Sequence, residues 1–503
     1  MIDGGLFLGR NPTNGNCLQK NELIPFMDRF SIAKGLVAHY KSIFYDFKEG
    51  NRELLEMYKD YPDRIIPVVI LSKNGIDVFR DENYLSYLRE SGARVLGIYL
   101  LPKYYDIYLE SYLLRSIAKN AVEKGFVLQF GLQNVEDLYK VIDYYGDLKS
   151  PLLIRWMSGS GYKNLAEILH TLKRFSNFYF DIGSLVNSGA IRYLVDCVGT
   201  ERLYYSSNIP ESFSLTSHFL IQSASLNRKE KEQIFSNTLG ALFSFDKKQK
   251  QCIQMDSIEQ SWRFILEKPK IDVHFHINGW NVLGPETNIN NFNKEFEIFN
   301  YKKVIFSSSE ALNYDLFVGN KQTMDLIETD PRFYGLIVID PTRVEDSLAE
   351  IEKYANHKKF VGLKTIQDLY GYRLDHSSYC IIFEKNKKIK LPVMGHILGM
   401  LEVSKMFPEF NFICAHSTWE RVKHMLGNEN IYFDLATSHN DVAETKMEKF
   451  IHEAGNEKIL FASDAQLINP AWTLGKLASS EIREDSLEKI LFFNALKAFP
   501  KLN

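Results

Sequence analysis

The strongest constraint on the fold of this chain is an internal repeat of about half its length. The dipeptide Ile2-Asp3 recurs as Ile271-Asp272, at an offset of 269 residues. The same offset carries the segment from Asn51 to Ile70 onto the segment from Asn320 to Ile339. Self-similarity at one long period indicates two copies of a single structural unit. We therefore expect a tandem duplication.

Further matches follow along the two halves at slightly smaller offsets, a drift that insertions at loops produce. The matched pairs are Gly97 with Gly362, Asp181 with Asp434, Ser207 with Ser463, and Asn237 with Asn494. In each half an asparagine, Asn51 or Asn320, precedes an amphipathic pattern, a Pro-containing turn and a β-branched strand. We expect both asparagines to act as helix N-caps.

Each half alternates short apolar runs, rich in β-branched residues, with amphipathic helical patterns. This alternation over roughly 240 residues predicts a parallel α/β fold, and its length and strand count fit a (β/α)8 barrel better than an open sheet. The expected fold class is α/β, with two tandem (β/α)8 TIM-like barrels. We expect a first barrel at residues 1–245, a linker with a charged stretch at 246–269, and a second barrel at 270–503.

Composition and charge exclude other classes of protein. Hydrophobic residues make up 45% of the 503 residues and the formal net charge is −3, so the chain has no basic footprint for nucleic acid. No apolar run reaches the 18 or so residues that a membrane span needs. The five cysteines are scattered without a Cys-x-x-Cys pair, and the first expected strand starts at Ile2, which leaves no room for a signal peptide. We expect a cytoplasmic protein with a small-molecule substrate and neither a nucleic-acid nor a membrane partner.

The second half opens with a His-x-His motif, His274 and His276, inside an apolar run. Alternate side chains of a β-strand point to the same face, so both imidazoles project together, away from Val273, Phe275 and Ile277. Two neutral imidazoles suit a divalent metal such as zinc when other strands supply further ligands. On its own the motif is more often a pair of strand histidines without a metal.

Other strands of the second half also end in residues suited to a metal site. His396, His416 and Asp464 each end a short apolar run, and Lys364 ends another. Taken singly, a strand-end histidine is often only hydrogen-bonded and a strand-end aspartate often caps a helix. Because the carboxyl ends of barrel strands meet at one mouth, we expect these side chains to converge with the His-x-His motif. The set predicts a divalent metal site, with zinc as the first choice and manganese as the second.

The order of these motifs, closed by Asn494-Ala495-Leu496 in a final helix, resembles that of the amidohydrolase superfamily of metal-dependent hydrolases. The closest branch resembles the amidohydrolase-2 group, which also contains decarboxylases of the aminocarboxymuconate-semialdehyde type. The resemblance covers residues 270–503.

The resemblance implies a role for each strand-end residue. The implied metal ligands are His274, His276, His396 and Asp464. His416 would orient the water and the substrate. In some branches a carboxylated lysine at the position of Lys364 bridges two metals, whereas mononuclear branches do without it. Both metal counts therefore stay open.

The ligand types predict the chemistry. A divalent ion held by imidazoles and one carboxylate lowers the pKa of bound water to about 7 and polarises a carbonyl group. Asp464 is expected to accept the proton of that water as a general base. The leading hypothesis is hydrolysis of a C–N or C–O bond in an amide, a lactone or a similar small molecule. Non-oxidative decarboxylation would use the same ligands, and a cation near the metal would favour it. A non-catalytic binding protein is the third alternative.

Loops that follow the strands carry candidate substrate contacts. These are Asn278, Trp280, Tyr372, Arg373, Trp419 and His439. The planar guanidinium of Arg373 suits a bidentate clamp on a substrate carboxylate, although a surface arginine on a loop is the commoner outcome.

The first half lacks the corresponding ligands. Gly5 and Phe7 stand opposite the two histidines of the motif, and Asn208 stands opposite Asp464. We expect a pseudo-barrel that keeps the fold without the chemistry. Because barrels of the resembled family commonly pair as homodimers, we expect the two halves to pack on each other as a pseudo-dimer. Binding of a regulatory ligand at the emptied mouth, through Arg155 or Asn208, is the alternative.

Overall fold

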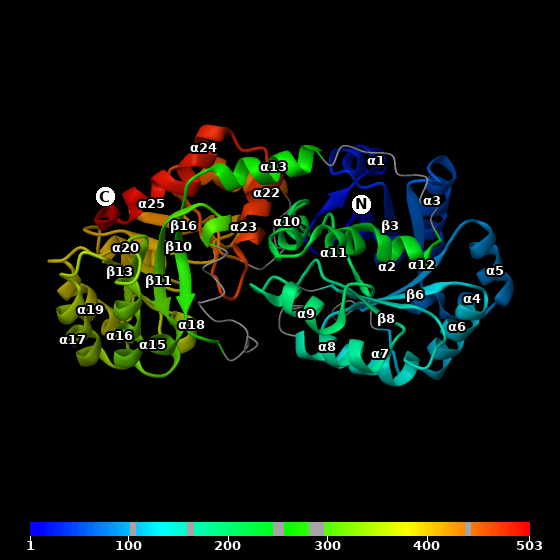
Figure 1. Cartoon of the computed structure of the whole chain (residues 1–503), viewed down its shortest axis with the longest axis horizontal. Coiled ribbons are helices and arrows are strands. Elements are labelled where there is room, and N and C mark those ends of the chain that lie inside the picture. Colours follow the sequence, from blue (N-terminus) through cyan, green and yellow to red (C-terminus); the bar gives the residue numbers. More distant parts are fainter. Residues whose placement is uncertain (101–106, 158–164, 245–255, 281–295, 438–443) are drawn as a thin grey trace. The chain divides into compact units, whose positions relative to one another are not determined.

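The structure, a computed structural model, forms two compact units (Figure 1). It describes residues 1–100, 107–157, 165–244, 256–280, 296–437 and 444–503. The first unit consists of Met1–Val186 and Ala190–Ser261, and the second of Asn187–Gly189 and Trp262–Asn503.

The first unit is built on a parallel sheet in the order β2-β1-β3-β4-β5-β6-β7-β8-β9, with β2 antiparallel to β1. The strands are β1 (Ile2–Arg10), β2 (Cys17–Leu18), β3 (Lys34–His39), β4 (Ile65–Ile70), β5 (Val95–Tyr99), β6 (Val127–Leu132), β7 (Leu152–Trp156), β8 (Phe178–Asp181) and β9 (Leu203–Tyr204). The sheet closes on itself, because the Gly4 N–H donates to the Tyr205 carbonyl (2.9 Å) and the Phe7 N–H donates to the Ile209 carbonyl (2.9 Å).

Helices follow the strands of the first unit and lie outside its sheet (Figure 1). They are α1 (Lys20–Arg29), α2 (Tyr40–Phe44), α3 (Phe47–Asp60), α4 (Ile76–Phe79), α5 (Glu82–Glu90), α6 (Tyr112–Glu123), α7 (Val135–Tyr145), α8 (Leu165–Arg174), α9 (Ala190–Val198), α10 (Thr216–Ser223), α11 (Arg228–Glu232) and α12 (Thr238–Leu242). A 3₁₀ turn, η1 (Lys73–Gly75), and a π-helical turn, η3 (Gln233–Asn237), interrupt them.

The second unit repeats this plan with a parallel sheet in sequence order from β10 to β17. The strands are β10 (Lys270–Ile277), β11 (Tyr301–Ser308), β12 (Phe333–Val338), β13 (Phe360–Lys364), β14 (Val393–Gly395), β15 (Phe412–Cys414), β16 (Ile431–Asp434) and β17 (Ile459–Leu460). The Asp464 N–H donates to the His274 carbonyl (2.8 Å), and the His276 N–H donates to the Ala465 carbonyl (2.6 Å). These bonds close the barrel between its first and last strands.

The helices of the second unit again follow the strands. They are α15 (Ser309–Asn313), α16 (Leu316–Ile327), α17 (Val344–Tyr354), α18 (Gln367–Tyr370), α19 (Ser377–Asn386), α20 (Met400–Met406), α21 (Trp419–Val422), α22 (Glu444–Ala454), α23 (Pro470–Ser479), α24 (Glu484–Glu488), the π turn η5 (Lys489–Phe493), α25 (Asn494–Ala498) and the 3₁₀ turn η6 (Pro500–Leu502). In the part of the chain that the structure describes, no helix combines the length and the apolar character needed to cross a lipid bilayer.

Two tandem TIM-like α/β units confirm the predicted fold class. The stretch expected as a linker, 246–269, contains a helix, α13 (Asp256–Glu267). The buried Lys270 side chain donates to the carbonyl groups of Ile265, Leu266 and Lys268, which ties the end of this helix to β10. The expected domain boundaries remain a prediction.

The expected N-caps at Asn51 and Asn320 are wrong. Each helix starts earlier, because the Asp46 carboxylate caps α3 and the Asp315 carboxylate caps α16. Asn51 therefore lies inside α3, where its amide donates to the Ile70 carbonyl (3.2 Å) and accepts from the Ile70 N–H (2.9 Å).

Asn320 holds the second barrel in the same way. Its side chain donates to the Val338 carbonyl (3.1 Å) and accepts from the Val338 N–H (2.9 Å). Both amides are buried, and each satisfies the N–H and carbonyl groups of a buried strand residue. The two matched asparagines thus make the same contact between a helix and a strand, and neither acts as a cap.

A close helix approach also recurs between the barrels. A Cβ atom added at Gly50 would lie 2.4 Å from the Ser42 nitrogen, and one added at Gly319 would lie 2.2 Å from the Ala311 nitrogen. Only glycine permits these backbones to come so close. A π-helical turn also occurs in each C-terminal helical stretch: η3 ends at Asn237, and η5 ends one residue before the matched Asn494.

Candidate active site

The predicted strand-end residues of the second unit gather at the carboxyl ends of its strands. His274 and His276 lie on β10, and Lys364 is the last residue of β13. His396 follows β14, His416 lies two residues after β15, and Asp464 comes shortly after β17. The barrel thus brings side chains nearly 200 residues apart in sequence to one mouth.

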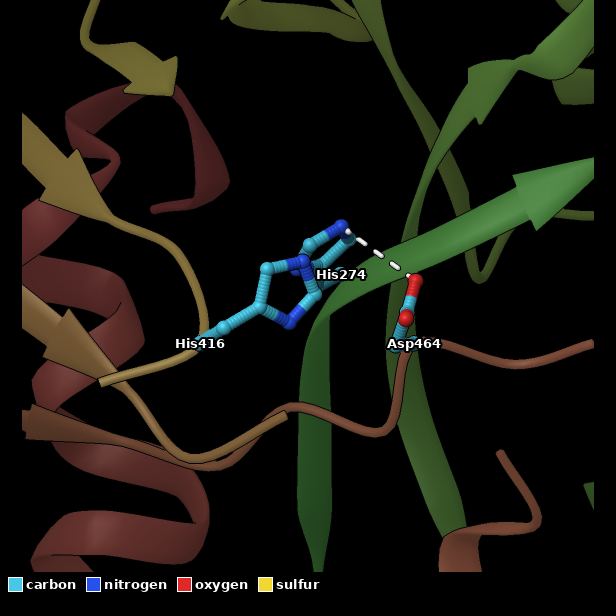
Figure 2. Close-up of side chains that lie close together, drawn as sticks. All are labelled: His274, His416 and Asp464. Atoms are coloured by element: carbon cyan, nitrogen blue, oxygen red, sulfur yellow. Dashed lines mark ion pairs between the residues drawn. The ribbon is translucent and has the colours of Figure 1, made fainter. Parts of the chain in front are cut away.

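His274, His416 and Asp464 form the centre of the site (Figure 2). One ligand atom from each lies within 4.8 Å of the others. Figure 2 shows the two imidazole rings next to each other, with the Asp464 carboxylate directed toward His274. The Nε2 atom of His276 lies 3.2 Å from Nε2 of His274 and 3.3 Å from Oδ1 of Asp464. The two motif histidines therefore face the same point, as the strand pattern predicts.

His396 lies at the edge of this centre. Its ring centroid is 5.0 Å from that of His416, and its Nδ1 atom pairs with the Asp368 carboxylate at 2.7 Å. His416, for which the resemblance implies an orienting role, has a ring nitrogen within 4.8 Å of the ligand atoms of His274 and Asp464.

Two residues of the centre have left-handed backbones. His416 has φ 55° and Asp464 has φ 61°. A non-glycine residue in this region costs on the order of 1 kcal/mol, and such residues cluster at functional sites. Both residues lie in the segments that follow a strand at the barrel mouth, β15 for His416 and β17 for Asp464.

A second set of polar groups orients the histidines. His274 Nδ1 pairs with Oδ2 of Asp434 (2.8 Å), and His276 Nδ1 pairs with the Ser307 hydroxyl (3.1 Å). His416 Nδ1 donates to the Ala436 carbonyl. In His274 and His416 the oxygen partner makes Nδ1 the donor, so the lone pair of the ring lies on Nε2, on the side of the centre.

Burial keeps these imidazoles neutral. It lowers the pKa of His274 well below its usual value, and it lowers the pKa of His416 to about 3. Burial acts to raise the pKa of Asp464, but its interactions with His276, His416 and Lys364 outweigh it, so the net pKa is lowered. Neutral imidazoles and an ionised carboxylate are the protonation states that bind a divalent metal.

Lys364 brings a cation into the same mouth. Its Nζ atom lies 2.8 Å from Nε2 of His274, and the side chain is buried. Burial lowers the pKa of Lys364 to about 8, while Asp434 and Asp464 act to raise it. The amine is directed at the histidine nitrogen that faces the centre.

The donor set fits a divalent metal. Oδ1 of Asp464 is buried, lies 3.3 Å and 3.6 Å from two imidazole Nε2 atoms, and has no hydrogen-bond partner among the described residues. An ionised oxygen left without a donor in a buried site is costly unless a cation satisfies it. Nitrogen and carboxylate ligands of this kind suit zinc or manganese.

Two predicted substrate contacts lie near the centre. The Trp280 ring lies 5.1 Å from the His276 ring, perpendicular to it, and its indole N–H has no hydrogen-bond partner among the described residues. Asn278 follows β10 with φ 68° and donates to the Ser308 hydroxyl (3.1 Å) and to the Gln322 side chain. Its amide therefore anchors the loop after β10.

The other predicted contacts have partners of their own. Arg373 is exposed and pairs with the carboxylates of Asp375 (3.0 Å) and Glu402 (3.3 Å). Trp419 donates its indole N–H to Glu453 on α22 (2.7 Å). Tyr372 packs on the His376 ring at 4.6 Å, beside a surface hollow lined by Pro341 to Asp346. The remaining one, His439, lies outside the described residues.

Sequence reasoning missed two buried carboxylates that support the site. Asp434 was matched as part of the repeat only, yet it accepts from His274 and from the His416 N–H (2.8 Å). Asp272 accepts the N–H groups of His274 (3.2 Å) and Ser463 (3.1 Å). Asp434 is the last residue of β16, so the search for polar residues at strand ends, which selected Asp464, could have selected Asp434 as well.

A family model described as Amidohydrolase matches residues 271–501, which is the second unit without its first few residues. The match begins at the strand that carries the His-x-His motif. No curated protein sequence matches the chain.

Solved structures similar to this chain each align over about half of it. The 2,6-dihydroxybenzoate decarboxylase from Rhizobium has 15% identity, covers 47% of this chain and 100% of its own, and has a TM-score of 0.38. A dihydroxybenzoic acid decarboxylase from Polaromonas with bound manganese and 2-nitroresorcinol has 16% identity, coverage of 47% and 98%, and a TM-score of 0.38. The 4-oxalomesaconate hydratase from Rhodopseudomonas palustris has 16% identity, coverage of 46% and 96%, and a TM-score of 0.37.

Proposed function

We propose that the second unit is a metal-dependent enzyme of the amidohydrolase type that acts on a small molecule. His274, His276 and Asp464 would hold one divalent ion, and His396 and His416 would complete its surroundings from the two neighbouring strand ends. The observation that carries this proposal is the buried Asp464 Oδ1, which faces two imidazole nitrogens and has no hydrogen-bond donor among the described residues. The Amidohydrolase family match over residues 271–501 supports it.

The leading reaction is hydrolysis of a C–N or C–O bond, as in an amide or a lactone. When bound, the ion supplies Lewis acidity that polarises a carbonyl group and acidifies water. The Asp464 carboxylate would accept a proton from water and return it to the leaving group. His416, held by the Ala436 carbonyl, would orient the water or the substrate through Nε2. The Trp280 indole N–H would contact the substrate from the side of His276.

Lys364 supports a second reaction, non-oxidative decarboxylation. A substrate carboxylate needs a cation close to the metal, and the buried Lys364 amine lies 2.8 Å from Nε2 of His274. Arg373 is less suited to that task because two carboxylates already pair with it. Loss of carbon dioxide would leave a carbanion, which needs a proton from an acid in the mouth.

Elemental analysis of the purified chain beside a His274→Ala/His276→Ala variant tests the metal site. We expect about one equivalent of zinc or manganese, lost in the variant. About two equivalents would indicate that Lys364 is carboxylated and bridges two metals through its carbamate oxygens. Absence of any metal, persisting after reconstitution, would leave the third alternative, a binding protein without catalysis.

Product analysis separates the two reactions. Small carboxylic acids, amides and lactones would be incubated with the metal-loaded chain, and carbon dioxide and ring-opened or cleaved products would be measured. A Lys364→Met variant serves as the matched test. Under decarboxylation it keeps the metal but loses carbon dioxide release, whereas under mononuclear hydrolysis it keeps most of its turnover.

We further propose that the chain arose by tandem duplication and that the first unit is a pseudo-barrel, packed on the second as a built-in partner. The repeated helix-to-strand asparagine clamp, glycine contact and π-helical turn support this proposal. Expression of residues 256–503 tests the partner role. A soluble fragment with full activity would count against it.

A further inference from the structure

The mouth of the first barrel contains a buried guanidinium group. Arg155 lies near the end of β7 with 1% of its surface exposed. It donates to Oδ1 of Asn208 (2.5 Å) and to the Gly5 carbonyl (3.4 Å), and its Cζ atom lies 4.9 Å from the centre of the Phe7 ring. Arginine is always charged in a protein, so this mouth holds a permanent cation.

The groups around Arg155 stand at the positions of the proposed metal ligands. In the repeat, Gly5 and Phe7 correspond to the motif histidines of the second barrel, and Asn208 corresponds to Asp464. Asn208 also shares the left-handed backbone of its counterpart, with φ 59° against 61°. A Cβ atom at Gly5 would lie 2.2 Å from Nη2 of Arg155. A histidine at this position and the guanidinium group exclude each other.

Strand register identifies the counterpart of Arg155 itself. Leu152 pairs with Phe178, three residues before Asp181, and Phe412 pairs with Ile431, three residues before Asp434. Counting forward from these pairs places Arg155 opposite Ala415. The second barrel has a methyl group where the first has a long cationic side chain, and this leaves its mouth open for an ion.

Both barrels retain the same two buried carboxylates. Asp3 and Asp181 of the first barrel correspond to Asp272 and Asp434 of the second, and all four are fully buried. Oδ1 of Asp3 accepts from the Gly5 N–H (2.9 Å) and the Ser207 N–H (3.1 Å). Asp272 makes the corresponding bonds.

The remaining carboxylate oxygens of the first barrel lack hydrogen-bond donors. Oδ2 of Asp3 and Oδ2 of Asp181 are buried and have no hydrogen-bond partner among the described residues. Oδ2 of Asp181 lies 4.0 Å from Nε of Arg155, whereas Oδ2 of Asp434 binds the ligand His274. Removing one partner from a buried ion pair leaves an uncompensated charge and is strongly destabilising.

We infer that the guanidinium group of Arg155 is a built-in cation that takes the place of the metal ion in the first barrel and compensates Asp3 and Asp181. The inference rests on the proposed metal site of the second barrel as its point of reference. The first barrel then has Arg155 in place of the metal ligands, because the buried carboxylates Asp3 and Asp181 require a positive charge nearby. The first barrel binds no metal and keeps its fold without one.

Hydrogen exchange of the full chain tests the inference, read from peptides that cover β1 and β7. In an Arg155→Ala variant we expect exchange of these peptides to rise by a factor on the order of 100 or more. Guanidinium ion at a few millimolar, far below denaturing concentration, should restore much of the protection, because it supplies the missing cation. Urea at the same concentration should not.

Three further variants distinguish charge from packing. Adding Asp181→Asn to Arg155→Ala removes one uncompensated carboxylate and should recover part of the protection. Arg155→Lys keeps the charge and should exchange more slowly than Arg155→Met, which keeps only the length. In Arg202→Ala, whose guanidinium donates to the Phe175 carbonyl at the opposite ends of the strands, guanidinium ion should have no effect.

The inference is overturned if neither guanidinium ion nor Asp181→Asn restores protection, or if Arg155→Lys and Arg155→Met exchange equally fast. If Arg155→Ala does not fold, the comparison of exchange in Arg155→Lys and Arg155→Met decides by itself whether Arg155 acts through its charge. Metal content of the same samples reports on the second barrel only. Its absence would refute the proposed function, while the exchange data would still show whether Arg155 acts through its charge.

Discussion

The mouths of the two barrels share an acidic framework but differ in what neutralises it. Each holds one aspartate on its first strand, β1 or β10, and another at the end of β8 or β16. In the second barrel histidines and Asp464 converge on a point that fits a metal ion. In the first, Arg155 fills the same place. A cation from solution leaves open coordination positions and permits chemistry, whereas a guanidinium group closes the site and contributes only stability.

The largest expected effect comes from making the second mouth resemble the first. Asp464→Asn removes the only carboxylate of the proposed ligand set and copies the residue found at Asn208. We expect loss of the bound metal and a fall in turnover by a factor on the order of 1000, since Lewis acidity supplies several kcal/mol of transition-state stabilisation. Elemental analysis and product formation measure the two effects.

The matched control for this change is Asn208→Asp in the first barrel. It should gain no metal, because Arg155 still lies between the would-be ligands. Wild-type metal content in Asp464→Asn, or a second metal equivalent in Asn208→Asp, would break the comparison between the two mouths.

The carboxylate behind His274 should have the next largest effect. Asp434→Asn weakens the bond to Nδ1 that orients the ring, so metal affinity should fall by about 10- to 100-fold. Competition with a chelator at fixed metal concentration measures the affinity. Asp181→Asn, at the matched position of the first barrel, should leave it unchanged, and an equal fall in both variants would contradict a local role for Asp434.

The stability of the first barrel should depend on pH through Asp181. Burial raises the pKa of Asp181 to about 6, against an ordinary value near 4. A carboxyl group with a raised pKa stabilises the fold below its unfolded pKa, and this contribution is lost as the pH rises through the folded pKa. The first barrel should therefore lose roughly 3 kcal/mol between about pH 4 and pH 6.

Denaturant unfolding at several pH values, read by hydrogen exchange of β7 and β8 peptides, measures this loss. In Asp181→Asn this group no longer titrates, so the pH dependence over this range should decrease, and the remaining part comes from Asp3, whose pKa burial also raises. The same slope in both proteins would mean that another group is responsible.

The smallest expected effects test what the two barrels have in common. Asn51→Ala and Asn320→Ala each leave a buried strand N–H and carbonyl without a partner, which should lower the free energy of unfolding by about 1–3 kcal/mol. Each change should act on its own barrel and by a similar amount. Unequal losses would indicate that the two clamps have diverged.

Much of the fold could be predicted because it depends on local pattern. Apolar strands alternating with amphipathic helices specify a parallel barrel, and the carboxyl ends of its strands necessarily share one face. His274, His276, His416 and Asp464 could be assigned to one mouth on that basis. The N-caps were misplaced because Asp46 and Asp315 start the helices earlier, a competition that the asparagine signal alone does not reveal.

The side-chain contacts of the site were harder to predict than its residues. Arg373 suits a carboxylate clamp by its chemistry, but Asp375 lies two residues away and pairs with it first. Lys364 is a strand-end residue in sequence, and only the closed barrel shows its amine next to His274. Such pairings depend on the register of strands that are far apart in the chain.

The sequence by itself determined that two barrels lie in tandem and that one of them carries the histidines and aspartate of a candidate metal site, because periodicity and strand-end position are local properties of the chain. Only the tertiary structure decided which groups touch. It places Asp434 behind His274 and Arg155 among Gly5 and Asn208, contacts that span 53 to 160 residues. Closure of the barrel brings these residues within contact distance, so the charged groups that meet in each mouth can be identified only in the folded chain.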